Sequence, residues 1–285
     1  MTIDDIPVIA PYFRFVTTNT CDFTVGGMFM WRDYFHMAWQ VEDGVLYSTL
    51  TGEDGNLYYN LPLGEDIPAG LRQCLARHPE RPVRFCTIPE AELPLFRELP
   101  GRVEITEEEN FADYLYSAEE MIQLSGKKFS GQRNHISRFL RTCQSWSFEP
   151  LDSTDAAEVE AFFHTLNKKL NYAPGEAAEE NHKVQEVLEH LDQYGLAGGV
   201  LRADGAIVGF TLGEVLRDTL YIHIEKADRD YPGAYQMLCR QFCTAYADGL
   251  AYVNREEDMG DLGLRKAKRD LHPVTQLKKY TVEVW

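Results

Sequence analysis

Alternating apolar and polar positions in the first half of the chain predict a strand meander followed by alternating helices and strands. Segments 35–41, 45–51 and 56–62 alternate with period two and are separated by glycine-containing turns. A helix at about 65–78, a strand at 83–88, a short helix at 89–99 and strands at 102–105 and 112–117 are expected next. The predicted order is meander, helix, strand, helix, strand.

The second half repeats this order with different residues. After a helical stretch at 118–145 we expect a strand at 146–152, a helix with apolar Val159, Phe163 and Leu166 on one side, and a second helix at about 180–194. Strands at 196–203, 207–216 and 219–227, a helix at 232–247, a strand at 250–254, a helix at 261–269 and a terminal strand at 276–285 follow. The repetition predicts an α/β (α+β) fold of two tandem domains, each a mixed, mostly antiparallel sheet flanked by helices. We place the domains at 1–120 and 148–285, with a linking helical segment at 121–147.

The composition of the chain indicates where the protein is located and whether it holds a metal. The N-terminus has two acids where an export signal would be basic, and no run of about 18 apolar residues occurs, so we expect a cytoplasmic chain without a spanning segment. The six cysteines form no CxxC pair and are expected to be reduced. Cys239 and Cys243 lie four apart on a predicted helix, but nothing completes a metal site, so we expect no metal and interpret them as buried small residues.

A net charge of -17 disfavours broad binding to nucleic acid or to an anionic membrane, and we expect no DNA partner. Basic residues are nevertheless concentrated in two stretches, which are 124–141 and 265–279. They could meet an anion locally on an acidic protein, or they could be solvated helix faces.

The polar segment 252–269 is the most unusual in the chain. A strand end delivers Asn254 into a loop that contains Gly260 and Gly263 and then opens a helix. Polar side chains can converge in such a loop without having to pack. Acids before the helix and bases in its last turn also suit the helix dipole, which is the purely structural interpretation.

On the strand at 219–227, Tyr221, His223 and Glu225 are expected to share one face. Glu225 or His223 could act as the general base that takes a proton from an attacking amine. The pair could equally form an internal hydrogen bond.

The turn at 228–235 enters a helix N-terminus, where a coenzyme's pyrophosphate could accept backbone N–H bonds. It offers only Gly233, and Asp228 and Asp230 would repel a pyrophosphate. Ordinary acetyl-coenzyme A binding is therefore disfavoured. The chain also has no GxxxxGK[ST], GxSxG or HExxH motif, which removes P-loop, hydrolase-elbow and zinc-protease functions.

Three segments carry a resemblance to a known family: GKKFSGQRNHISRF, IEKADRDYPGAYQ and YVNREEDMGDLGLRKAKRDLHP. Together with the aromatic terminal strand they resemble soluble bacterial relatives of the phosphatidylglycerol lysyltransferase C-terminal domain. The resemblance covers most of the chain and implies two tandem GNAT-like domains, as in Fem-type aminoacyltransferases. It implies transfer of an aminoacyl group from an activated donor, possibly aminoacyl-tRNA, to an acceptor amine or hydroxyl, with no cofactor required.

The resemblance also implies site residues. Glu225 and Asn254 would be catalytic, together with His223, which the strand pattern proposes, and the substrate-binding residues would be Lys128, Arg133, Asp228, Glu256, Asp258, Arg265 and Lys268. The bases would contact phosphate or carboxylate and the acids would hold an amine. A small-molecule acceptor is expected, whereas the acidity of the chain disfavours tRNA and the absence of a spanning portion makes a phospholipid acceptor doubtful. The alternatives are a non-catalytic module that binds an amino acid and an N-acetyltransferase that uses acyl-CoA.

Overall fold

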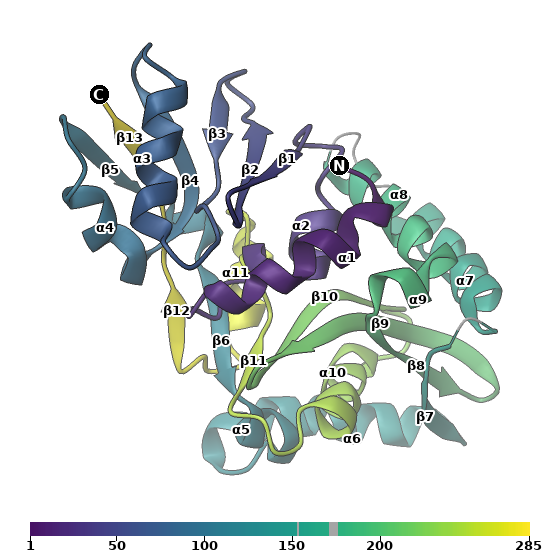
Figure 1. The fold of residues 1–285 in the computed structure, drawn as a ribbon. Coiled ribbons are helices and arrows are strands. Elements are labelled where there is room, and N and C mark those ends of the chain that lie inside the picture. The colour runs from purple at the N-terminus through teal and green to yellow at the C-terminus, as the bar shows by residue number, and fades with distance from the viewer. Residues whose placement is uncertain (153, 171–175) are drawn as a thin grey trace. The chain divides into compact units, whose positions relative to one another are not determined.

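The computed structural model describes residues 1–152, 154–170 and 176–285, and these divide into two units (Figure 1). The first unit consists of residues 1–113, 257–261 and 276–285, and the second of residues 114–256 and 262–275. Segment 252–269, which the sequence singles out, is therefore divided between the two units.

A six-stranded sheet forms the frame of the first unit, in the order β1-β2-β3-β4-β13-β5. Its strands pair antiparallel except for β3 and β4, which are parallel. Its strands are β1 (Ala38–Glu42), β2 (Val45–Thr51), β3 (Leu57–Tyr59), β4 (Val83–Pro89), β5 (Val103–Glu107) and β13 (Lys279–Val284). The predicted meander is confirmed as β1, β2 and β3.

The helices of the first unit include a set near the N-terminus that the apolar pattern did not predict. Aromatic residues and short 3-10 turns there break the regular 3.6-residue period that would have indicated helices. The helices are η1 (Ile3–Asp5), α1 (Ile6–Ile9), η2 (Ala10–Phe15), η3 (Cys21–Phe23), α2 (Val25–Phe29), α3 (Ile67–Arg77), η4 (Glu90–Glu92), α4 (Leu93–Arg97) and η5 (Glu109–Phe111).

Strand β13 belongs to the first sheet, which corrects the expected assignment of the terminal strand to a domain at 148–285. It pairs antiparallel with β4 on one side and with β5 on the other. Its side chains Val282 and Val284 are fully buried and Tyr280 is 8% exposed. A strand that pairs on both sides has partners for its backbone N–H and C=O groups, so it can be buried at low cost. A central position in the sheet is therefore consistent with the buried apolar side chains of β13.

A seven-stranded sheet forms the frame of the second unit, in the order β12-β6-β11-β10-β9-β8-β7. Its bounds are β6 (Asp113–Ser117), β7 (Trp146–Pro150), β8 (Ala197–Ala203), β9 (Ala206–Leu216), β10 (Thr219–Ala227), β11 (Tyr252–Asn254) and β12 (Thr275–Leu277). Strands β7 to β10 form an antiparallel meander, and β11 runs parallel to β10.

Helices cover both faces of this second sheet (Figure 1). They are α5 (Ala118–Gln123), η6 (Lys127–Phe129), α6 (Ser130–Thr142), α7 (Ala156–Leu170), α8 (Glu176–Glu189), α9 (Leu191–Tyr194), α10 (Ala234–Tyr246) and α11 (Leu262–Arg269). On one face, α10 packs through Leu238 and Phe242, both fully buried. On the other face, Phe162 and Phe163 of α7 meet Phe210 of β9 edge to face, at 6.3 and 5.6 Å.

Helix α6 is an integral part of the second unit, which corrects the expected linking segment at 121–147. Its residues Ile136 and Phe139 are 4% and 0% exposed and share a buried cluster with Leu238 of α10. Apart from Gly131 and the exposed Leu140, the other residues of α6 are polar, which is why the sequence suggested a linker. Two buried residues a single turn apart are enough to fix a helix to a core.

Other expectations of the sequence have clear outcomes in the structure. The mixed α/β class is confirmed, and Cys239 and Cys243 are both buried. In the described part of the chain no helix is both long enough and apolar enough to cross a membrane.

Candidate functional site

A β-bulge in β10 separates the three residues that the sequence places on one face. The register of β10 with β9 shifts between Ile222 and Ile224, so that His223 has no direct partner in β9. A bulge inserts one extra residue and reverses the alternation beyond it. The expectation that Glu225 shares a face with Tyr221 and His223 is therefore wrong.

Neighbouring glycines of β9 identify the two faces. A Cβ on Gly213, the partner of Ile222, would lie 3.1 Å from the Phe242 ring of α10, and one on Gly209 would lie 3.2 Å from Leu238 of the same helix. Between these two glycines lies the partner of Glu225. Glu225 consequently faces α10, whereas His223 stacks on Tyr221 on the opposite face, with the rings at 6.4 Å and 12°.

His223 is held between two carboxylates. Its Nδ1 lies 2.7 Å from Glu256 and its Nε2 lies 2.9 Å from Glu214 of β9, and its side chain is 1% exposed. Burial by itself lowers the pKa of His223, but the hydrogen bonds to Glu214 and Glu256 outweigh burial and raise it to about 10. A histidine that is already protonated at neutral pH is a poor general base, so this geometry favours the structural interpretation of His223.

Asn254 organises the turn that brings Glu256 to His223. It is fully buried at the end of β11, and its Oδ1 accepts a 2.6 Å hydrogen bond from the backbone N–H of Glu256. Glu256 adopts a left-handed conformation with φ of 57°. An Asx turn of this kind stabilises such a backbone, so Asn254 acts on the Glu256 carboxylate through its position.

Glu225 and Arg255 form a buried ion pair on the α10 face. Arg255 donates from Nη2 to Glu225 Oε1 at 2.7 Å, and their side chains are 16% and 9% exposed. The second oxygen of Glu225 and the Nε of Arg255 are both buried without a hydrogen-bond partner in the described part of the chain. The pair thus has one acceptor atom and one donor atom without a hydrogen-bond partner among the described residues.

This pair lies where two parallel strands stop pairing. β10 and β11 pair only over Thr219 to Tyr221 and Tyr252 to Asn254. β10 then continues to Ala227, and no strand of the described residues pairs with it on that side.

Helix α11 closes the other side of Arg255. Lys268 is 6% exposed, and its Nζ donates to the carbonyl oxygen of Arg255 at 2.6 Å and lies 5.8 Å from the Tyr114 ring. Tyr116 in turn donates from its hydroxyl to the Lys268 carbonyl at 2.8 Å. Lys268 therefore fixes the backbone of Arg255, and Arg265 lies half-buried one turn earlier on the same side of α11.

Other predicted site residues have local partners away from this pair. Lys128 bonds both carboxylate oxygens of Glu120, at 2.6 and 2.7 Å. Arg133 donates to the carbonyl oxygens of Leu124 and Gly126, two residues with positive φ, and so stabilises their turn. Asp258 is 2% exposed and belongs to the first unit, where it accepts from the backbone N–H of Gly260 at 2.9 Å.

The turn before α10 is already occupied by side chains of the chain. Asp228 and Asp230 both bind Nζ of Lys169, at 2.8 and 2.9 Å. Gly233, with φ of 90°, lies so close to α6 that a Cβ would be 2.0 Å from the carbonyl oxygen of His135. Two carboxylates and a covered helix start do not suit a pyrophosphate.

Sequence reasoning missed Arg255 and Glu214 as members of these clusters. Arg255 stands beside Asn254 in the singled-out segment, so its charge at a strand end was a usable signal. Glu214 gave no signal, because its contact with His223 depends on the antiparallel register of β9 and β10.

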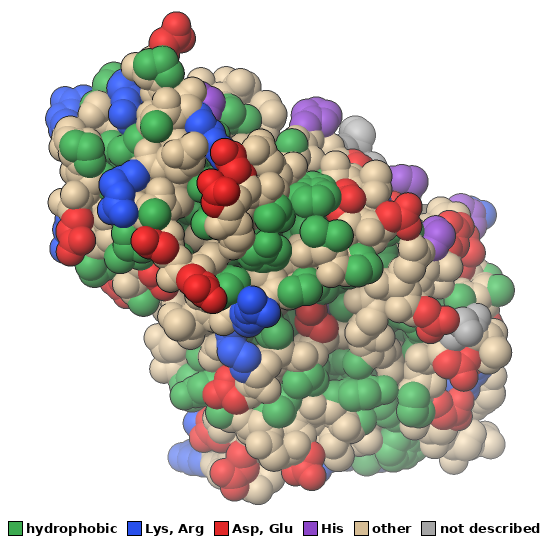
Figure 2. Space-filling model, viewed as in Figure 1, with side chains coloured by type: hydrophobic (Ala, Val, Ile, Leu, Met, Phe, Trp, Pro, Cys, Tyr) green, Lys and Arg blue, Asp and Glu red, His purple; other side chains and the backbone are tan. Residues whose placement is uncertain are grey.

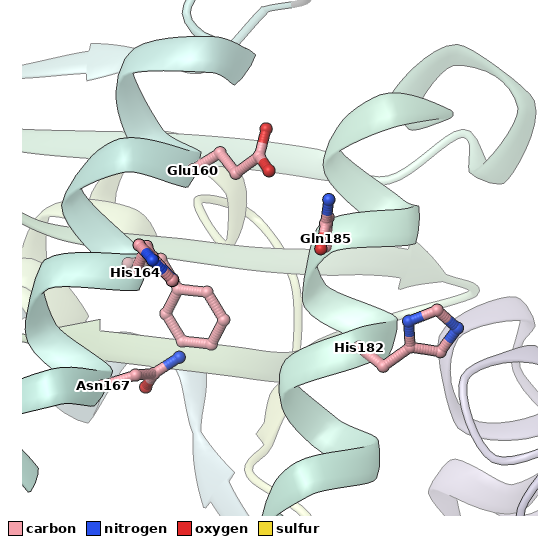
Figure 3. A pocket seen from close by; sticks show the side chains of 6 residues that line it. Glu160, His164, Asn167, His182 and Gln185 are labelled. Atoms are coloured by element: carbon pink, nitrogen blue, oxygen red, sulfur yellow. The ribbon is translucent and has the colours of Figure 1, made fainter.

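A separate hollow of about 260 Å³ lies between α7 and α8 (Figure 3). Glu160, His164 and Asn167 contribute from α7, and His182 and Gln185 from α8; Phe163 of α7 also lines the hollow. Because α7 packs on the face of the sheet opposite α10, this hollow is distinct from the Glu225 and Arg255 pair.

Comparisons with known proteins agree with the architecture. A structure of a conserved protein of unknown function from Bacteroides thetaiotaomicron is 31% identical, with a TM-score of 0.90 over 100% of this chain and 98% of that one. The C-terminal domain of a putative lysylphosphatidylglycerol synthetase from Agrobacterium fabrum is 16% identical, with a TM-score of 0.70 over 99% and 92% of the two chains. FemX is 8% identical, with a TM-score of 0.64 over 100% and 96%. The predicted tandem GNAT-like fold is confirmed.

Sequence comparison identifies the family. An uncharacterized protein from Mycoplasmoides gallisepticum is 26% identical over 179 residues, which is 62% of this chain and only 57% of that protein's length. Residues 13–283 match the family described as phosphatidylglycerol lysyltransferase, C-terminal. The chain therefore belongs to the phosphatidylglycerol lysyltransferase C-terminal family.

Proposed function

We propose that this chain transfers an aminoacyl group from an activated ester donor to an acceptor amine or hydroxyl at Glu225 and Arg255. The observation that carries the proposal is that one oxygen of Glu225 and the Nε of Arg255 are buried without a hydrogen-bond partner among the described residues. Both residues lie just beyond the point where β10 and β11 stop pairing. Membership of the family and the fold shared with a putative lysylphosphatidylglycerol synthetase domain support it.

In the proposed reaction, the acceptor's nitrogen or oxygen forms a bond to the ester carbonyl carbon, and the bond from that carbon to the donor's ester oxygen breaks. The free Glu225 oxygen takes the proton of the attacking group and returns it to the leaving hydroxyl. Arg255 Nε–H polarises the carbonyl, where negative charge develops. His223 maintains the strand geometry from the opposite face of the sheet.

A minimal donor tests this proposal. The wild-type chain, supplied with 2′(3′)-O-aminoacyl adenosine esters and a panel of amines and alcohols, should give a transferred product detectable by mass spectrometry. Glu225→Gln keeps the size of the side chain but cannot accept the proton, so we expect the rate to fall by roughly a hundredfold or more.

Glu214→Gln is the matched control, because it neutralises another buried carboxylate that is paired with a cation on the opposite face of the same sheet. It should lower thermal stability and retain most of the transfer rate. Equal rates for Glu225→Gln and the wild type would remove the pair from catalysis. Tight binding of amino acids without any transfer would identify a binding module, and turnover of acetyl-coenzyme A would identify an acetyltransferase.

A further inference from the structure

The hollow between α7 and α8 is lined by a carboxylate that has no counter-charge. Glu160 is half-buried there and has no hydrogen-bond or ion-pair partner among the described residues. Glu158, two residues earlier on α7, differs because Arg202 donates to both of its carboxylate oxygens, at 2.8 and 2.7 Å. A partly buried carboxylate without a partner is costly, so its place in a hollow indicates that a cation from solution complements it.

A second lining residue of α7 has an acceptor that the protein does not use. Asn167 lies two helical turns after Glu160, and its Oδ1 is buried without a hydrogen-bond partner among the described residues. Most buried polar side-chain atoms in folded proteins have a partner. An oxygen that lacks one and lines a hollow therefore indicates a donor that comes from outside the chain.

Helix α8 contributes a third acceptor from the facing side. Gln185 donates from Nε2 to Glu189 at 3.2 Å, so its amide oxygen can accept from a ligand. Figure 3 shows Glu160 and Gln185 extending into the space between the two helices, whereas His182 points away from α7. The hollow thus collects acceptors from both helices.

This lining selects a small cation with N–H donors. No lysine or arginine is among the described residues that line the hollow, so a carboxylate or phosphate would find no counter-charge. A primary ammonium carries three N–H donors, one for each of Glu160, Asn167 and Gln185. Phe163, which is 3% exposed, also lines the hollow and offers an apolar contact to an aliphatic chain. The volume of about 260 Å³ lies below the roughly 300–1,000 Å³ of sites for drug-sized ligands, which suits a smaller molecule.

The arrangement favours an organic cation over a metal ion. Among the described residues, the one group whose metal-ligating atoms lie within 4.8 Å of one another is Cys21, Asp22 and Asp113, so Glu160 and the two histidines of the hollow do not form such a group. Acidic and histidine side chains gather in Figure 2 where Figure 1 shows α7 and α8. A negative surface raises the local concentration of cations of any kind, including amines.

We propose that the hollow between α7 and α8 binds a small aliphatic primary amine without a carboxylate, with its ammonium group at Glu160, Asn167 and Gln185. Since α7 packs on the face of the sheet opposite α10, this site is separate from the Glu225 and Arg255 pair. The inference does not depend on the proposed transfer reaction, because the amine held here is a second ligand and is not consumed.

A nuclear magnetic resonance titration of the ¹⁵N-labelled chain with n-butylamine, an ammonium ion at neutral pH, tests the site. We expect saturable shifts of backbone amide signals in residues 160–167 and 182–185, and no comparable shifts with 1-butanol or butyrate. Glu160→Gln should weaken binding by roughly tenfold or more, because it removes a charge-assisted hydrogen bond. Asn167→Leu should weaken it by roughly threefold or more, because it removes a neutral acceptor.

Glu158→Gln is the matched control, since it removes the same charge from the same helix but from a carboxylate that already has a cationic partner. It should keep the wild-type affinity. Glu225→Gln should keep it too, which separates this ligand from the acceptor amine of the proposed reaction.

Four results would overturn the proposal. Equal weakening by Glu158→Gln and Glu160→Gln would show non-specific attraction to an acidic surface, and equal binding of 1-butanol would show an apolar hollow only. Loss of butylamine binding in Glu225→Gln alone would place the amine at the other site, and absence of saturable shifts would remove the site altogether. Failure of the wild-type chain to transfer an aminoacyl group would count against the proposed function and leave this site unaffected.

Discussion

At the scale of single residues, buried charged side chains of this protein lie next to groups of opposite charge, and His223 is the clearest case. Its ring is enclosed by Glu214 and Glu256, with almost no contact with solvent. The folded pKa of about 10 lies above the ordinary value of 6.5. The stabilising contribution is therefore complete below about pH 6.5 and is lost as pH rises towards 10.

His223→Gln should accordingly destabilise the chain most at low pH. We expect the difference in the free energy of unfolding between wild type and variant, measured by urea titration, to shrink by up to roughly 4 kcal/mol between pH 6 and pH 10. His182→Gln, an exposed histidine of the same unit, is the control. A difference that does not change with pH would contradict a charged His223.

A second residue-scale cluster concerns Lys279, buried in the first unit. Its Nζ lies 2.7 Å from Asp113 and 2.8 Å from Asp22, next to the Cys21 thiol at 3.4 Å. Burial opposes its charge, but Asp113 and Asp22 raise the pKa of Lys279 well above its ordinary value. Cys21, Asp22 and Asp113 also have the spacing of metal ligands, but the ammonium already supplies the cation there.

Lys279→Met should destabilise the first unit by roughly 3–5 kcal/mol, because it leaves buried carboxylates without their counter-charge. Lys278→Met is the adjacent control. Lys278 is 44% exposed and pairs with Glu107 on the surface, so its loss should hardly change the free energy of unfolding. Similar unfolding midpoints for the two variants would show that the cluster contributes little.

At the scale of elements, periodicity located the strands and most of the helices but failed at β10. Leu220, Ile222 and Ile224 alternate without interruption, so the pattern gives no sign that an extra residue is inserted between them. The bulge depends on pairing with β9, which is a long-range contact. That single residue decides which face Glu225 occupies, and with it the composition of the candidate site.

Helix α6 gives a test of element membership. Phe139→Ala should lower the free energy of unfolding of the second unit by roughly 3–5 kcal/mol, since its ring is completely buried. Leu140→Ala, one residue further on and 45% exposed, is the control and should have little effect. If Phe139→Ala were as mild as the control, α6 would be a loosely attached linker after all.

At the scale of the whole molecule, the repeated order of elements was predictable but the division of the chain was not. The two halves have the expected succession of strands and helices, because local periodicity is visible in sequence. Strand β13 and residues 257–261 join the first unit through contacts with residues far earlier in the chain. The local pattern of apolar and polar residues cannot show that a late strand pairs with strands formed much earlier in the chain.

The position of β13 has a consequence for how the protein is made. The six-stranded sheet lacks its link between β4 and β5 until residues 279–284 have left the ribosome, long after the other five strands. During translation the nascent first unit must therefore remain open, with the edges of β4 and β5 exposed, while most of the second unit emerges. Chaperone capture and mispairing are most to be expected in that interval.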